Sequence, residues 1–168
     1  VKVVTDRYQK NPTRHEVGDV EPDITTARHL FWKVAHMDRK DHAVDAIKDA
    51  GPTIVFCRTR RGADRLTQQL AKSGVKAAAI HGGRSQGQRD RALESFVKGR
   101  VDALVATDVA ARGIHVDGVA CVLHFDPPED EKTYLHRSGR TARAGATGVV
   151  VSLVRSEELP DNRKMQRK

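Results

Sequence analysis

The sequence predicts an α/β domain in which a mostly parallel β-sheet is flanked by helices on both faces. Continuous apolar runs, typical of strands buried on both sides, recur along the chain. Segments with apolar residues at helical spacing lie between several of these runs. Strands that alternate with helices pair in parallel through crossover connections. The chain of 168 residues is long enough for one such domain with a substantial core.

The first half of the domain is expected to contain three strands and two helices. Asp38 is a favourable helix N-cap, and Gly51-Pro52 and Gly74 are typical helix stops. The second helix carries its apolar residues on one face. The expected elements are a strand over 28–34, a helix from Asp38 to Gly51, a strand over 54–57, a helix over 59–73 and a strand over 75–80.

The second half is expected to add one helix and three strands. Ser85 and Gln88 have the spacing of a capping box, which opens a helix. Gly99 ends this helix. Its predicted apolar stripe comprises Ala92, Leu93, Phe96 and Val97. The three further strands are expected over residues 101–106, 119–125 and 148–154.

The chain is expected to divide into one domain and two flanking segments. Residues 1–22 combine a short apolar run with a polar stretch that lacks a period, so we expect the end of a preceding domain and a linker. Residues 23–156 hold the α/β pattern. Residues 157–168 form a charged tail that contains a proline.

Composition narrows the class of partner and the compartment. The formal net charge is +8 and the pI is near 9.8, which favours an acidic partner, with nucleic acid the leading candidate. Cys57 and Cys121 lie in apolar runs, which predicts buried, reduced thiols and a cytoplasmic protein. The cysteines and histidines have no ligand spacing, so no metal site is predicted on this chain. The sequence has no apolar stretch of membrane-spanning length, so no membrane role is expected.

The segment H-R-S-G-R-T-A-R-A-G at 136–145 is predicted to grip phosphate. It places three arginines at intervals of three residues. Their guanidinium groups stay charged and present paired donors that match phosphate oxygens. The alternative is a solvated basic helix face.

The rest of a nucleotide-hydrolysing site is not found in the sequence. There is no G-x-x-x-x-G-K-[ST] loop to hold the phosphates of a nucleotide and no D-E-x-D cluster to position Mg²⁺. Arginines that stabilise the transferring phosphate can be supplied by a separate module. The sequence therefore predicts half of an active site.

Three expected strand-to-helix junctions carry polar residues. They are Arg58-Thr59, His81-Gly82-Gly83 and Thr107-Asp108. In parallel sheets, ligands bind at the carboxyl ends of the strands, so these groups are expected on one rim. The two glycines leave backbone N–H groups accessible to a phosphate. For each junction taken separately, the alternative is a tight turn.

Four segments in order resemble the C-terminal RecA-like domain of the DEAD-box RNA helicases. I-V-F-C-R-T at 54–59 resembles the fourth motif of the family, and H-G-G-R-S-Q-G-Q-R at 81–89 resembles the element that follows it. A-T-D-V-A-A-R-G at 106–113 resembles the fifth motif, and H-R-S-G-R-T-A-R at 136–143 resembles the sixth. The resemblance implies a three-layer RecA-like fold. T-D-R-Y-Q-K-N-P at 5–12 resembles the end of the first domain of the family.

The resemblance also implies roles for individual residues. Arg140 and Arg143 match arginines that reach the γ-phosphate of ATP, with Mg²⁺ and most of the nucleotide held by the first RecA-like domain. Asp108 lies in the motif that links RNA to nucleotide, and His136 and Arg137 match positions that contact the other domain. Binding to RNA, mainly through the sugar-phosphate backbone, is implied for Arg58, Thr59, Gly82, Gly83, Gln86, Arg89, Thr107 and Arg112.

Three residues depart from the pattern of the family. His115 stands where the family has an aspartate that contacts the ribose, and Asp117 is the candidate substitute. Gly83 replaces an aspartate. Ala142 replaces a glycine, which restricts how the loop between Arg140 and Arg143 bends.

Two classes of function follow from these patterns. The favoured class is part of an ATP-dependent RNA helicase, inactive in ATP hydrolysis by itself and active when a nucleotide-binding domain closes over ATP and RNA. The alternative is a noncatalytic basic RNA-binding or adaptor module. A superfamily 2 helicase that acts on DNA is disfavoured by the strings at 106–113 and 136–143.

Overall fold

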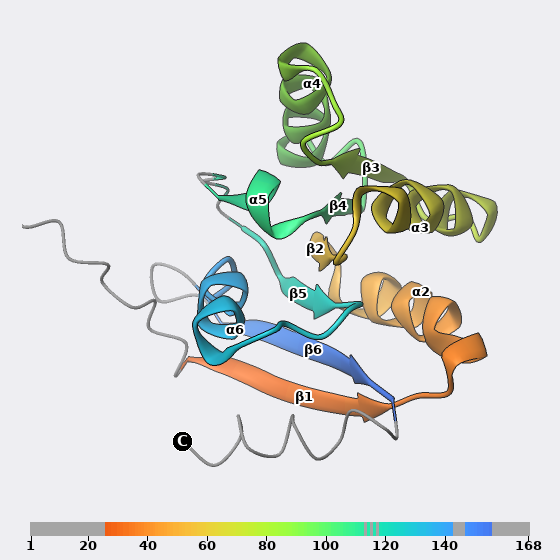
Figure 1. Cartoon of the computed structure of the whole chain (residues 1–168), viewed down its shortest axis with the longest axis vertical. Helices are drawn as coiled ribbons and strands as arrows, with labels where there is room; N and C mark the ends of the chain where they lie inside the picture. Colours follow the sequence, from red (N-terminus) through yellow and green to blue (C-terminus); the bar gives the residue numbers. More distant parts are fainter. Residues whose placement is uncertain (1–25, 113, 115, 117, 143–146, 156–168) are drawn as a thin grey trace, which may run out of the picture.

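The computed structural model of the chain describes residues 26–112, 114, 116, 118–142 and 147–155, and Figure 1 shows their arrangement. The expected segments 1–22 and 157–168 lie outside the described residues.

Six strands form one sheet in the order β1-β6-β5-β2-β4-β3, and every neighbouring pair is parallel. The predicted parallel sheet is therefore confirmed. The strands are β1 (Ala27–Lys33), β2 (Thr53–Phe56), β3 (Ala77–Ile80), β4 (Ala103–Ala106), β5 (Cys121–His124) and β6 (Gly148–Val154).

The helices cover both faces of this sheet. They are the 3-10 helix η1 (His36–Asp38) and the α-helices α2 (Arg39–Ala50), α3 (Arg60–Lys72), α4 (Gln86–Val97), α5 (Asp108–Ala111) and α6 (Glu131–Ser138). Figure 1 shows α2 and α3 on the opposite side of the strands from α5 and α6.

Two cores fill the spaces between the three layers. Because side chains alternate along a strand, Val55 of β2 packs with α2 and α3, whereas Ile54 and Phe56 pack with α4 and α5. All four residues of β2 are buried, as are those of β4 and β5. This burial explains why these strands are continuously apolar. Cys57 and Cys121 are buried free thiols, as predicted.

The helix starts follow local signals in two cases and depart from them in one. Ser85 and Gln88 form the predicted capping box at α4, with hydrogen bonds of 3.3 and 2.9 Å. Thr59 caps α3 by accepting the N–H of Gly62. Asp38 stands at the N-cap of α2, but its side chain makes no cap hydrogen bond because it belongs to the preceding 3-10 turn.

The predicted strand over 75–80 begins later than expected. Val75 donates its N–H to Leu70 at the end of α3, and Lys76 donates to the side chain of Asp102. These bonds serve the turn, so β3 begins at Ala77. The predicted apolar stripe of α4 was wrong at Val97, which is 63% exposed because it is the last residue of the helix. Among the described residues, none of the helices has the length and apolar composition needed to span a membrane.

Candidate functional site

Three strand ends bring the predicted polar junctions to one edge of the sheet. Phe56 of β2, Ala106 of β4 and Ile80 of β3 are aligned partners in adjacent parallel strands. The backbone bonds continue one residue further, from Cys57 N to Ala106 O at 2.9 Å and from Thr107 N to Ile80 O at 3.3 Å. The chain therefore leaves all three strands at the same level, and the polar residues that follow lie along one rim.

At the β2–α3 junction, Arg58 and Thr59 are exposed. The N–H of Arg58 donates to Asp126 Oδ2 at 2.9 Å, which ties this junction to the end of β5. Thr59 Oγ1 accepts the N–H of Gly62 at 3.0 Å. The hydroxyl oxygen is therefore engaged in the cap, while its proton remains able to donate to a ligand.

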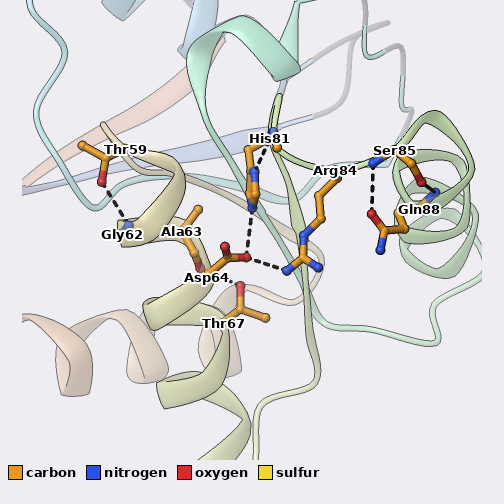
Figure 2. Close-up of polar contacts among 10 residues, drawn as sticks. Thr59, Gly62, Ala63, Asp64, Thr67, His81, Arg84, Ser85 and Gln88 are labelled. Carbon is orange, nitrogen blue, oxygen red and sulfur yellow. Dashed lines mark hydrogen bonds and ion pairs between the residues drawn. The ribbon is translucent and has the colours of Figure 1, made fainter.

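The side chain of His81 connects the loop after β3 to α3, as Figure 2 shows. His81 is 3% exposed and its Nε2 lies 2.9 Å from Asp64 Oδ1 on α3. Arg84 Nη2 donates to the same carboxylate oxygen at 2.5 Å. These two contacts lower the pKa of Asp64, with the hydrogen bond from His81 the largest cause.

The other ring nitrogen of His81 supports the backbone of the loop. His81 Nδ1 accepts the N–H of Gly83 at 3.1 Å. A Cβ atom at Gly83 would lie 3.1 Å from Nδ1, so a larger residue there would press on the ring. At Gly82, a Cβ atom would lie 3.4 Å from the guanidinium of Arg60. The contact at Gly83 is tight and favours glycine, whereas the contact at Gly82 has an ordinary van der Waals length.

Gln86 and Arg89 meet on the first turn of α4. Arg89 Nη1 donates to Gln86 Oε1 at 3.3 Å, and Gln86 Nε2 donates to Asp90 Oδ1 at 2.7 Å. The buried Nε of Arg89 has no hydrogen-bond partner among the described residues. Gln86 and Arg89, both expected to contact RNA, are therefore hydrogen-bonded to each other.

Asp108 and Arg137 form a two-pronged ion pair between α5 and α6. Arg137 Nε and Nη2 donate to the two carboxylate oxygens of Asp108 at 2.6 and 2.8 Å. Arg137 Nη1 donates to the carbonyl of Asp126 at 2.8 Å, and the residue is only 3% exposed. Arg137 thus links two helices inside the domain, and its contact with another domain stays a prediction.

Arg140 lies beside this ion pair. Its Nη1 donates to the carbonyl of Ile114 at 2.8 Å, and its Nε donates to His136 O at 3.3 Å. Together with Asp108, Arg112 and His136, it lines a hollow of about 50 Å³. The structure therefore groups Arg112 with the residues predicted to serve the nucleotide.

The residues Arg143, His115 and Asp117 lie outside the described residues. Ala142 is described and has a φ of +54°, in the left-handed region where glycine is favoured. The glycine typical of the family at this position therefore matches the backbone that this chain adopts.

Sequence reasoning missed three side chains that shape this rim. Asp64 and Arg84 support the loop after β3, and Arg60 covers Gly82. Asp64 is four residues into α3, so its sequence neighbours place it on a helix surface and not beside His81. The signal that could have found Arg60 is its position next to the Arg58-Thr59 junction.

Comparison with protein families identifies a match over most of the domain. The model of the helicase conserved C-terminal domain matches residues 38–145. The chain is 36% identical to the DEAD-box ATP-dependent RNA helicase CshA of Bacillus licheniformis, over 99% of this chain and 36% of CshA. It is 39% identical to the ATP-dependent RNA helicase DBP2 of Eremothecium gossypii, over 86% of this chain and 27% of DBP2. The chain spans about a third or less of the length of such relatives.

Solved structures match the described fold closely. The E. coli DEAD-box protein SrmB, solved with the regulator of ribonuclease activity A, superposes with a TM-score of 0.78 at 37% identity, covering 84% of each chain. S. cerevisiae Dbp5 bound to RNA and ADP BeF3 superposes with a TM-score of 0.78 at 27% identity, covering 99% of this chain and 45% of Dbp5.

Proposed function

Because this chain belongs to the helicase C-terminal domains of the DEAD-box RNA helicases, we propose that it clamps the RNA backbone and supplies arginine side chains to ATP bound by a first RecA-like domain. In the complete protein these two actions couple ATP hydrolysis to RNA unwinding. By the same reasoning, residues 1–22 end the first domain and form the linker, residues 23–156 form this domain, and residues 157–168 form a charged tail.

The RNA part of the proposal rests on one observation: the adjacent strands β2, β4 and β3 end at the same edge of the sheet. Phe56, Ala106 and Ile80 are in register, so the junctions after them form one continuous polar rim. That rim offers N–H groups, hydroxyls and arginines, which are donors that suit phosphodiester oxygens. Such contacts carry no base specificity, so binding should be nonspecific and should weaken with salt. The RNA-contacting set consists of Arg58, Thr59, Gly82, Gly83, Gln86, Arg89, Thr107 and Arg112.

The size of the hollow at Arg140 supports a shared nucleotide site. A volume of about 50 Å³ holds one or two water molecules, which is too little for a base and a ribose. Among the described residues, no group of His, Cys, Asp or Glu side chains could hold a metal ion. The small volume fits a chain that contacts the phosphates of ATP, and we propose that the first domain holds Mg²⁺ and most of the nucleotide.

Arg140 and Arg143 are the proposed catalytic arginines of this half-site. Positive charge placed against the γ-phosphate stabilises the charge that develops there during transfer. Asp108 would link the RNA rim to the nucleotide side through Arg137. His115 and Asp117 are proposed to face the ribose, and His136 and Arg137 to adjoin the first domain.

The catalytic part is tested by ATP hydrolysis in two proteins. The 168-residue chain by itself should show no turnover, with or without single-stranded RNA. In a protein that contains both RecA-like domains, Arg143→Ala should abolish turnover and leave RNA affinity nearly unchanged, because the guanidinium acts on the phosphate. Lys48→Ala, which removes an exposed cation from α2, is the control. Unchanged turnover in Arg143→Ala would reject the arginine-finger assignment.

The RNA part is tested by equilibrium binding of single-stranded RNA at several salt concentrations. Arg89→Ala should weaken binding and lower the salt slope by about one unit, because one phosphate contact is lost. Arg91→Ala removes an exposed arginine from the opposite face of α4 and should have little effect. If the two variants behave alike, Arg89 is not part of the clamp. Strong RNA binding without RNA-stimulated hydrolysis in the two-domain protein would favour the adaptor alternative.

A further inference from the structure

A cavity of about 430 Å³ opens between α2 and α3, next to the rim but on the side away from Gly82 and Gly83. Arg58 and Thr59 form one wall, so the cavity continues directly from the proposed RNA contacts. The remaining lining that matters here comprises Met37, Arg39, Lys40, Arg65, Phe125 and Asp126. Among the described residues that the sequence predicted for the site, Arg58 and Thr59 are the two that line this cavity.

Arg39 is a buried charge with unused donor capacity. The residue is 7% exposed, and its Nη2 donates to Asp126 Oδ1 at 2.9 Å. Its guanidinium carbon lies 4.3 Å from the centre of the Phe125 ring, which is a cation–π contact. Its buried Nε has no hydrogen-bond partner among the described residues. Burying a charged donor without a partner is costly, so Arg39 contributes positive charge to the cavity wall that is only partly compensated.

The charge of the cavity is strongly positive. Its lining includes four arginine and lysine side chains, and the acidic residue in it is Asp126. Both oxygens of Asp126 are already occupied, Oδ1 by Arg39 and Oδ2 by the N–H of Arg58. Lys40 is paired with Asp41 at 2.8 Å. Within the described part of the chain, the exposed side chains of Arg58 and Arg65 make no ion pair, so they remain to meet an anion.

The size of the cavity indicates which class of anion it can hold. A volume of about 430 Å³ lies in the range of pockets that enclose small organic ligands, well above the room that a single inorganic ion needs. Met37, 84% exposed, and Phe125 add apolar surface against which a sugar or a base can lie. A phosphate with its nucleoside satisfies both the charge and the apolar surface.

We propose that this cavity binds one further nucleotide of the RNA strand, just beyond the phosphate held at Arg58 and Thr59, with its phosphate between Arg58 and Arg65. The inference rests on the proposed RNA clamp and extends it from the β2–β4–β3 rim to the groove between α2 and α3. It makes Arg65 an RNA-binding residue, although Arg65 lies outside every motif that the sequence displays.

The test compares two arginines of α3 that differ in position alone. Arg65→Gln removes a cavity charge, and Arg61→Gln removes an exposed charge of the same helix that does not line the cavity. Binding of fluorescein-labelled oligo(U) RNA to the 168-residue chain is measured by anisotropy over a salt series. Arg65→Gln should weaken binding about fivefold and lower the salt slope by about one. Arg61→Gln should change affinity by less than about twofold, because long-range electrostatics is screened.

Other results would overturn the inference. If both glutamine variants weaken RNA binding equally, net charge is the cause and the cavity has no specific role. If Arg65→Gln leaves RNA binding intact but weakens binding of a polyglutamate peptide, the cavity takes an acidic protein segment instead. Arg89→Ala in the same assay separates this inference from the clamp itself. If Arg89→Ala weakens RNA binding and Arg65→Gln does not, the proposed RNA clamp is supported and the proposed nucleotide site in the cavity is rejected.

Discussion

Asp64 on α3 and His81 after β3 are joined by a contact of 2.9 Å between Oδ1 and Nε2. Because His81 Nδ1 accepts the N–H of Gly83, the proton of the neutral ring sits on Nε2 and is donated to Asp64. The carboxylate therefore sets the ring orientation, and the ring sets the position of the Gly83 backbone. Asp64 is a positioning residue for a loop that we propose to contact RNA (Figure 2).

We expect Asp64→Leu to weaken RNA binding about fivefold and to lower the free energy of unfolding by about 1 to 3 kcal/mol, because it leaves the buried Nε2–H of His81 unpaired. Asp64→Asn keeps an oxygen acceptor and should retain RNA affinity close to that of the parent chain. Anisotropy with labelled RNA and urea denaturation measure the two effects. Equal losses in both variants would show that the negative charge, and not the acceptor, is what matters.

Arg137→Ala should lower the free energy of unfolding by about 3 kcal/mol in urea denaturation. The substitution leaves Asp108 without its two-pronged partner and breaks the bond to the carbonyl of Asp126. Arg137→Lys keeps the charge but cannot reproduce the two-pronged contact, so its free energy of unfolding should lie between those of the parent chain and Arg137→Ala. A loss below about 1 kcal/mol for Arg137→Ala would mean that the ion pair contributes little to the fold, and would favour a main role at the interface between domains.

Ala142→Gly should stabilise the chain by about 1 kcal/mol, because a non-glycine residue with a φ of +54° carries left-handed strain. The control is Ala111→Gly in α5. Ala111 is buried to a similar degree but is helical, so glycine there should destabilise by about 1 kcal/mol. Thermal unfolding of the three proteins measures both changes. A destabilised Ala142→Gly would show that packing of the methyl group outweighs the backbone strain.

His124 should make the stability of the chain depend on pH below about 6.5. Burial lowers the pKa of this histidine well below its usual value, and the charges of Arg137 and His29 act in the same direction. The unfolded chain therefore binds a proton that the folded chain does not. The contribution of His124 to stability should be fully present above the pKa that this histidine has in the unfolded chain. As pH drops below that pKa, the free energy of unfolding should decrease by up to about 1.4 kcal/mol per pH unit.

His124→Asn removes this titration and should flatten the dependence between pH 6.5 and the onset of acid unfolding, in urea titrations across a pH series. His36→Asn, at an exposed position, should leave the slope unchanged. An identical slope in His124→Asn and in the parent chain would assign the pH dependence to other groups.

Much of the fold could be predicted because its signals are local. The run over 148–154 matches β6 residue for residue, and Ser85 with Gln88 forms the predicted capping box. The start of β3 was less predictable, because bonds from Val75 to Leu70 and from Lys76 to Asp102 delay the strand until Ala77. Within the site, the contacts of Asp64 and Arg39 could not be predicted because their partners lie far along the chain, and the roles of the motif glycines and arginines stay predictions.

The sequence by itself determined the alternation of strands and helices, the helix caps and the order of the motifs, because each depends on residues within a few positions of one another. The tertiary structure alone decided the strand order β1-β6-β5-β2-β4-β3 and the register that aligns Phe56, Ala106 and Ile80 at the ends of their strands. It also decided that Arg137 is buried against Asp108 while Arg58 faces solvent, although the two are the same residue type. The order of strands in a sheet, their register and the pairing of buried charges are set by contacts between distant segments, which no local pattern encodes.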